Sequence, residues 1–114
     1  MGEPSLRQRA LRHLARRDHS RAELMRKLVA HGERAEVAAL IDRMSELGLQ
    51  SDRRHAEAFV RGKAARFGSG RLRSELARRG IERELIDEAI ARECVESETE
   101  RARVVLRSRF PDTP

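Results

Sequence analysis

The chain is poor in the residues that usually build large cores or redox centres. It contains no Trp or Tyr, three Phe and one cysteine, Cys94, among 114 residues. One cysteine excludes an internal disulfide and a cysteine-based zinc cluster, so we interpret Cys94 as a small apolar helix residue. No apolar run is long enough to span a membrane, and no signal segment is recognisable. The sequence therefore predicts a cytoplasmic protein with an aliphatic core.

Motifs for catalysis and metal binding are also missing. The sequence has no Walker-type phosphate loop, no H-E-x-x-H motif and no nucleophile elbow. Four histidines share no spacing that places two on one helical turn, and we interpret them as exposed or adjacent to helix caps: His13, His19, His31 and His55. The stretch Gly68-Ser69-Gly70-Arg71 could cradle a phosphate at a helix start, but a plain turn explains it as well. We therefore expect no enzyme, no cofactor and no metal.

Positive charge is abundant and unevenly distributed. The net charge is +6, and Arg outnumbers Lys 23 to 2. Residues 53–79 hold nine Arg or Lys against Glu57 and Glu75, a net of +7, and residues 6–17 hold five arginines without an acid. This density favours a polyanion or an acidic partner surface, although solvated arginine faces on helices would look the same.

Apolar residues recur at helical spacing along the whole chain, and no segment has the alternation of a strand. Three helices are expected before residue 50. The second begins at a capping box, Ser20 with Glu23, and ends at Gly32, and the third stops at Gly48. The expected inward residues of the three helices are Leu6, Ala10, Leu11 and Leu14; Leu24, Leu28 and Val29; and Val37, Leu40, Ile41, Met44 and Leu47, with Leu49 as an anchor beyond the stop.

Three further helices are expected after residue 50. Asp52 is expected to cap the fourth helix and Ser69 the fifth, which should end with Gly80 in the left-handed conformation. Acids crowd the first two turns of the sixth helix, where the helix dipole favours them. The expected inward residues are Ala56, Phe59, Val60 and Ala64; Leu72 and Leu76; and Leu85, Ile86, Ala89 and Ile90.

The helical pattern repeats. Leu72, Leu76 and Gly80 lie 48 positions after Leu24, Leu28 and Gly32, and the apolar residues near 102–106 lie 46 positions after those of the fourth helix. We predict an all-α protein of tandem three-helix repeats, with a first repeat at 6–49, a second at 52–94 and the first helix of an incomplete third at 97–110.

Several motifs, taken in order, resemble one family. They are Leu14-Ala15-Arg16-Arg17, Ser20-x-x-Glu23-Leu24-x-x-Lys27-Leu28, Leu47-Gly48-Leu49, Asp52-x-x-x-Ala56-x-x-Phe59-Val60 and Gly68-x-x-Arg71-Leu72-x-x-Glu75-Leu76-x-x-x-Gly80-Ile81. Together they resemble the RecX regulatory proteins over about residues 6 to 110. The resemblance implies an elongated, curved array of three-helix repeats. It also implies a non-enzymatic modulator that binds the RecA–single-stranded-DNA filament and inhibits its ATPase, strand-exchange and coprotease activities. Separately, we expect the chain to be a monomer.

The contact candidates rest on charge and position, helped by the resemblance. They are arginines in and around the fifth helix and at the end of the first: Arg16, Arg17, Arg66, Arg71, Arg73, Arg78 and Arg79. RecA, or single-stranded DNA, would be their partner. The alternative is a small helix-turn-helix-like DNA-binding protein that reads duplex DNA with the fifth helix, whose exposed residues are Arg, Ser and Glu rather than Asn or Gln.

Overall fold

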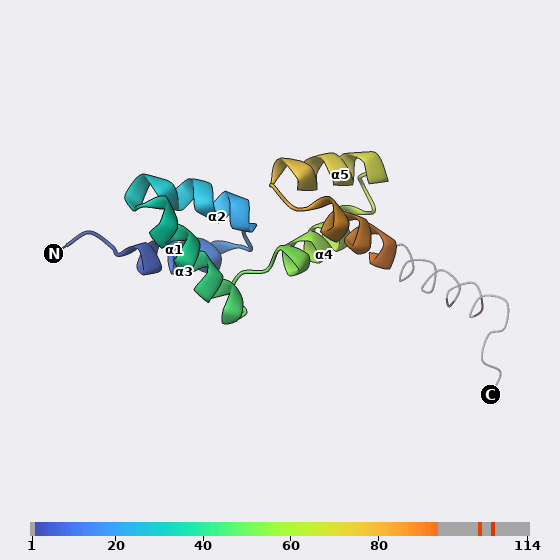
Figure 1. The fold of residues 1–114 in the computed structure, drawn as a ribbon. Coiled ribbons are helices and arrows are strands. Elements are labelled where there is room, and N and C mark those ends of the chain that lie inside the picture. Colours follow the sequence, from blue (N-terminus) through green and yellow to red (C-terminus); the bar gives the residue numbers. More distant parts are fainter. Residues whose placement is uncertain (1, 94–102, 104–105, 107–114) are drawn as a thin grey trace, which may run out of the picture.

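The computed structural model describes residues 2–93, Arg103 and Leu106, and in this part of the chain all regular structure is helical (Figure 1). The α-helices are α1 (Leu6–Arg16), α2 (Arg21–Leu28), α3 (Arg34–Glu46), α4 (Asp52–Lys63) and α5 (Ser69–Arg78). A short 3-10 turn, η1 (Val29–His31), extends α2, and residues 83–93 form a sixth helix. The all-α prediction is confirmed.

Two groups of three helices stand next to each other, and each encloses its own apolar core (Figure 1). We call α1–α3 the first unit and α4, α5 and residues 83–93 the second unit. The overall extents are 67 × 33 × 22 Å, so the arrangement is elongated, as predicted. None of the described helices is both long and apolar enough to cross a bilayer.

Each core uses the apolar stripes that the helical spacing predicts, because one face of every helix must leave water. The first core consists of Ala10, Leu24, Leu28, Val37 and Ile41. The second consists of Ala56, Val60, Leu72, Leu76, Ile81, Ile86, Ala89 and Ile90. Leu24, Leu28, Ile41, Val60, Leu72, Leu76 and Ile86 are buried as predicted, whereas Phe59 is half-buried at the edge of the second core.

The helix starts show which capping predictions hold. The Ser20–Glu23 capping box is present, and a second box, which the sequence analysis missed, joins Ser5 to Gln8 at the start of α1. The prediction that Asp52 caps α4 is wrong, because Ser51 is the cap and accepts from the Arg54 backbone N–H. Gly68 rather than Ser69 precedes α5, and no side chain caps that helix.

The glycines that follow the helix ends have two different backbone conformations. Gly48 and Gly80 have φ of 76° and 80°, and each ends its helix with the paired backbone bonds of a Schellman motif. Gly32, the sequence counterpart of Gly80, has an extended backbone with φ −172°. Its lack of a side chain instead accommodates Leu6, since a Cβ on Gly32 would lie 2.6 Å from Leu6 Cδ1.

Several apolar residues expected inside lie at the surface. Val29 is 39% exposed because the last turn of its helix tightens to a 3-10 turn, which rotates the side chain away from the predicted stripe. Leu47 and Leu49 are 47% and 42% exposed. They flank the Gly48 turn, where Arg54 donates hydrogen bonds to the backbone carbonyls of Gly48 and Leu49 and keeps the turn outside both cores. Leu11 and Ala64 are also exposed.

The predicted division into repeats at 6–49, 52–94 and 97–110 extends beyond what the structure describes. The expected first helix of a third repeat, and Cys94, lie outside the described residues apart from Arg103 and Leu106, which are helical. The boundaries therefore stay a prediction.

Candidate cationic surfaces and the junction between the units

The seven predicted contact arginines do not all have the same surroundings. Arg16, the last residue of α1, and Arg66, in the turn before α5, are exposed, as are Arg71, Arg73 and Arg78 on α5. Arg17 and Arg79 follow the ends of α1 and α5, and both line the junction between the units. The structure therefore does not bring the seven together on one continuous surface.

Arg17 and Arg79 meet around Glu23 and a buried histidine of the second unit. Arg17 Nη2 lies 3.1 Å from Glu23 Oε2, and Glu23 Oε1 lies 3.5 Å from His55 Nε2. Arg79 Nη1 lies 3.3 Å from the same His55 nitrogen. The guanidinium of Arg79 also stacks over the Phe59 ring, 4.3 Å from its centroid. Both arginines thus make contacts at the junction between the units.

Helix ends meet at the same junction. The C-terminal end of α5 faces the N-terminal end of α2 (Figure 1), and the Ser20 hydroxyl donates to the Arg79 carbonyl over 2.5 Å. A carbonyl end opposite an N–H end is a favourable alignment of helix dipoles. The approach is close, since a Cβ on Gly80 would lie 2.4 Å from the Cβ of Ala22. Gly80 thus combines a left-handed turn with a close contact between the units.

Asp52 forms hydrogen bonds that connect the start of α4 to the first unit. Its Oδ1 accepts from the Arg21 backbone N–H at 2.7 Å and from Gln50 Nε2 at 2.8 Å. Gln50 is buried, and its side chain also reaches the backbone carbonyl of His19. Asp52, which belongs to the second unit, therefore accepts a hydrogen bond from a backbone N–H at the start of α2. This contact gives the two units a defined relative orientation.

The junction holds ionisable groups in unusual states. Burial alone would raise the pKa of Glu23, but the hydrogen bonds from the Ser20 backbone and Arg17, together with nearby positive charge, lower it to about 2. Burial lowers the pKa of His55, and Arg79 adds to this against the opposing effect of Glu23. His55 is therefore neutral near pH 7 and accepts a hydrogen bond from Arg79.

His19 is a second buried histidine, 2% exposed. Its Nδ1 donates to the Arg17 carbonyl at 3.0 Å, and its Nε2 accepts from Lys27 Nζ at 2.9 Å. Burial lowers its pKa, and the positive charges of Arg17 and Lys27 act in the same direction. The expectation of exposed or cap-adjacent histidines holds for His19, which precedes the cap residue Ser20, although its ring is buried. It is wrong for His55, which lies inside α4 and is buried by contacts with the first unit.

The junction encloses an open pocket of about 310 Å³ whose lining is balanced in charge. Two cations, Arg17 and Arg79, face two carboxylates, Asp18 and Glu23, beside neutral His55. In the part of the chain that the structure describes, no cluster of three metal-ligating side chains occurs. The residues around this pocket are arranged to join the two units.

Acids from the sixth helix neutralise much of the basic stretch in the second unit. Arg73 pairs with Asp87, Arg53 pairs with Glu88 at 2.6 Å, and Arg61 lies 3.9 Å from Glu93. Arg78 lies 3.9 Å from Glu75 one turn earlier on α5. The counted net charge of +7 for residues 53–79 therefore overstates the positive field that a partner would meet.

Two of the exposed candidate arginines of the second unit have no acidic partner in the described part of the chain. Among the described residues, no acid forms an ion pair with Arg66 or Arg71. The Arg71 guanidinium lies 3.7 Å from the centroid of Phe67, and Lys63 approaches the same ring at 5.8 Å. We call Lys63, Arg66, Phe67 and Arg71 the α4–α5 corner. It combines free cations with a half-buried aromatic ring.

Family models match both units separately. A model of the first three-helix domain of RecX matches residues 7–44, and a model of the second three-helix domain matches residues 51–90. A relative named regulatory protein RecX, from Leptothrix cholodnii, is 41% identical over 96% of this chain and 70% of its own length. The chain belongs to the RecX family.

Two other RecX relatives show a similar degree of identity to this chain. The regulatory protein RecX of Herbaspirillum seropedicae is 40% identical over 96% of this chain and 71% of its own length. That of Chromohalobacter salexigens is 46% identical over 77% of this chain and 59% of its own length. The chain therefore spans roughly three fifths to seven tenths of these RecX proteins. RecX proteins are regulatory rather than enzymatic, in agreement with the expectation from the sequence.

Proposed function

We propose that this chain regulates the RecA recombinase by binding the RecA–single-stranded-DNA filament. In this proposal the bound chain inhibits the ATPase, strand-exchange and coprotease activities of the filament, in the cytoplasm and as a monomer. The observation that carries the proposal is the match to both RecX three-helix domains, with about 40% identity to regulatory proteins across nearly the whole chain.

The structure supports a particular contact within this proposal. A filament presents DNA phosphates and acidic protein side chains, both of which attract arginine. The α4–α5 corner offers Arg66 and Arg71 with no internal acid, whereas Arg73 and Arg78 have acidic neighbours. We therefore assign the filament contact of the second unit to this corner, and we assign Arg17 and Arg79 to the junction.

The alternative of a duplex reader draws little support from α5. Its Arg73 is held by Asp87 and its Arg78 lies near Glu75, so two of its exposed arginines already have partners. A recognition helix instead presents free side chains to base edges in the major groove. Sequence-specific retention of a duplex in gel shifts would favour this alternative.

A titration of the chain into RecA on single-stranded DNA tests the proposal. The rate of ATP hydrolysis should fall as the chain is added, and the inhibition should weaken as salt rises, because the contact is largely electrostatic. A folded chain that leaves ATP hydrolysis unchanged at every concentration and at low salt would contradict the proposed function. Circular dichroism of the same sample establishes that the chain is helical.

A further inference from the structure

The first unit carries a second cationic surface that lies apart from the α4–α5 corner. Helix α1 contains four arginines and no acid. Three of them, Arg9, Arg12 and Arg16, lie on one side of the helix because of its 3.6-residue period, and we call these three the α1 face. Arg12 and Arg16 are exposed, and Arg9 is half-exposed with its guanidinium 3.5 Å from His31 Nε2. Within the described residues, none of the three forms an ion pair with a carboxylate.

The α1 face is electrostatically unfavourable on its own. Arg9, Arg12 and Arg16 follow one another at spacings of three and four residues, which places them on neighbouring turns. Like charges at this spacing destabilise a helix. The positive field is also felt by His13 on the same helix, whose pKa is lowered by burial and by Lys27, Arg16, Arg17 and Arg9. Nothing in the described chain offsets this repulsion.

The rest of the helix holds the arginines in place. The Ser5–Gln8 capping box fixes the start of α1, and Ala10 is completely buried with Leu6 and Leu14 packed beside the first core. Arg9 and Arg16 are seven positions apart, or about 10 Å along the axis, with Arg12 between them. The helix therefore holds the backbone of the three arginines in one row on a rigid element.

The chemistry of the α1 face fits a phosphodiester backbone better than a protein. Guanidinium groups bind phosphate oxygens through two parallel hydrogen bonds. Protein interfaces usually need a buried aromatic or aliphatic anchor, and this face offers only Leu11, 38% exposed, between its arginines. Arginines clustered along one helix are the typical electrostatic footprint of nucleic-acid binding.

We propose that the α1 face binds the phosphate backbone of a nucleic acid directly, as a site separate from the α4–α5 corner. This inference goes beyond the proposed function, because it requires no RecA. Each unit then contributes one cationic contact, and the junction between the units fixes how the two contacts are placed relative to each other.

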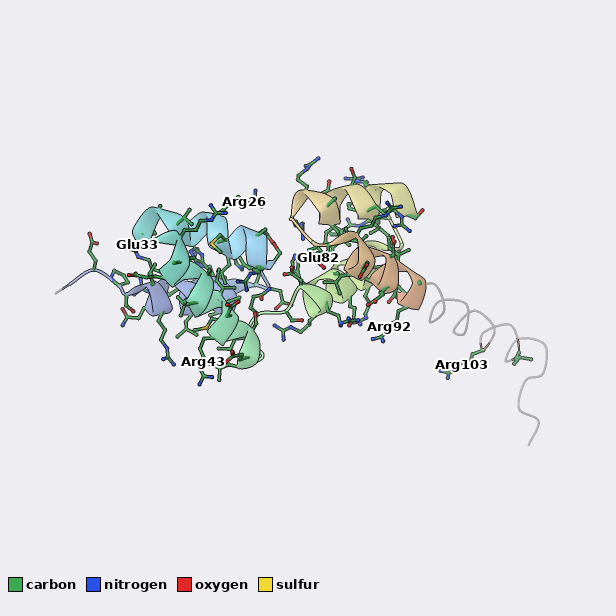
Figure 2. All side chains as sticks on the ribbon, viewed as in Figure 1. Arg26, Glu33, Arg43, Glu82, Arg92 and Arg103 are labelled. Carbon is green, nitrogen blue, oxygen red and sulfur yellow. The ribbon has the colours of Figure 1, made fainter. Side chains whose placement is uncertain are left out.

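The test measures binding of fluorescein-labelled oligothymidylate to the full chain by fluorescence anisotropy, without RecA. The test variant is Arg12→Gln with Arg16→Gln. The matched control is Arg43→Gln with Arg92→Gln, which removes the same charge from arginines paired with Glu46 and Glu57. Arg43 and Arg92 lie on α3 and the sixth helix, away from α1 (Figure 2). A duplex of equal length forms the second arm and distinguishes the two sources of phosphate.

The parent chain should bind, and the α1 variant should bind at least about tenfold more weakly than the control. Its plot of log affinity against log salt should flatten by roughly 0.7 for each arginine lost on a single strand. Arg12→Lys with Arg16→Lys should keep most of the binding. The proposal is overturned if the parent does not bind, or if test and control variants lose the same affinity. RecA inhibition is not used here, so failure of this site and failure of the proposed function remain distinguishable.

Discussion

The α1 face and the basic stretch of the second unit are both rich in arginine but have different surroundings. Both consist of closely spaced arginines on helices. In the second unit, acids of the sixth helix lie against the arginines of α4 and α5, and one of these pairs, Arg53 with Glu88, is separated by 35 residues in sequence. On α1 no such acid is present. The net charge of a sequence window therefore predicts the surface potential only where the fold brings no opposite charge to it.

The largest loss of stability should follow from substitutions in the apolar cores, and it should be similar in the two units. Leu28→Ala in α2 and Leu76→Ala in α5 should each lower the free energy of unfolding by about 2–5 kcal/mol, because both side chains are completely buried. Urea denaturation followed by circular dichroism measures this. A loss within experimental error for either variant would show that the helical stripe of that unit is misplaced.

Neutralising a carboxylate at the junction should lower stability by a smaller amount than the core substitutions do. Neutralising a carboxylate at the surface should lower it less still. Glu23→Gln should cost about 1–3 kcal/mol, because it removes charged hydrogen bonds with Arg17 and the Ser20 backbone at a nearly buried site. Glu57→Gln removes one exposed pair with Arg92 and should cost less than about 1 kcal/mol. Equal costs in urea denaturation would mean that Glu23 does not join the units more strongly than a surface ion pair does.

Acidification should weaken the junction through its histidines. The folded-state pKa values of His19 and His55 are lowered, so the unfolded chain takes up protons more readily below about pH 6.5. Stability should be complete above that pH and should fall as the pH is lowered toward about 5.5, where Glu23 is still ionised. The urea midpoint of the parent should show this slope, and His55→Gln should flatten it. A parent midpoint independent of pH would contradict the neutral, buried state of these rings.

The smallest changes in stability are expected for single arginine substitutions, which compare an unpaired arginine of α1 with a paired arginine of the sixth helix. Arg92→Gln should destabilise the chain by up to about 1 kcal/mol, because it breaks an ion pair. Arg12→Gln should leave stability unchanged or raise it by about 0.2–0.5 kcal/mol, because it relieves repulsion from Arg9 and Arg16. If Arg12→Gln costs more than Arg92→Gln in the same urea assay, Arg12 has a stabilising role within the molecule and the comparison fails.

Local patterns in the sequence predicted most of the fold. The Ser20–Glu23 cap, the Gly48 and Gly80 stops and most of the two apolar stripes depend only on residues within a few turns of one another. The positions of Val29, Leu47 and Leu49 could not be predicted in this way, because a 3-10 turn and the Arg54 hydrogen bonds move them to the surface.

The candidate site was predicted less well, for a physical reason. Whether an arginine is free depends on acids from other helices, as with Asp87 beside Arg73, and the burial of His55 depends on the first unit docking against the second. The capping box of Ser5 and Gln8, by contrast, was readable from the spacing S-x-x-Q alone.

The central claim is that free arginines, rather than total positive charge, carry the contact with the filament. RecA ATP hydrolysis on single-stranded DNA, measured with two variants of equal net charge, tests this most directly. The first, Arg66→Gln with Arg71→Gln, removes the two free arginines of the α4–α5 corner. The second, Arg53→Gln with Arg92→Gln, removes paired ones. The account predicts that the first loses most of its inhibition while the second inhibits nearly as well as the parent. Equal inhibition by both folded variants would contradict it.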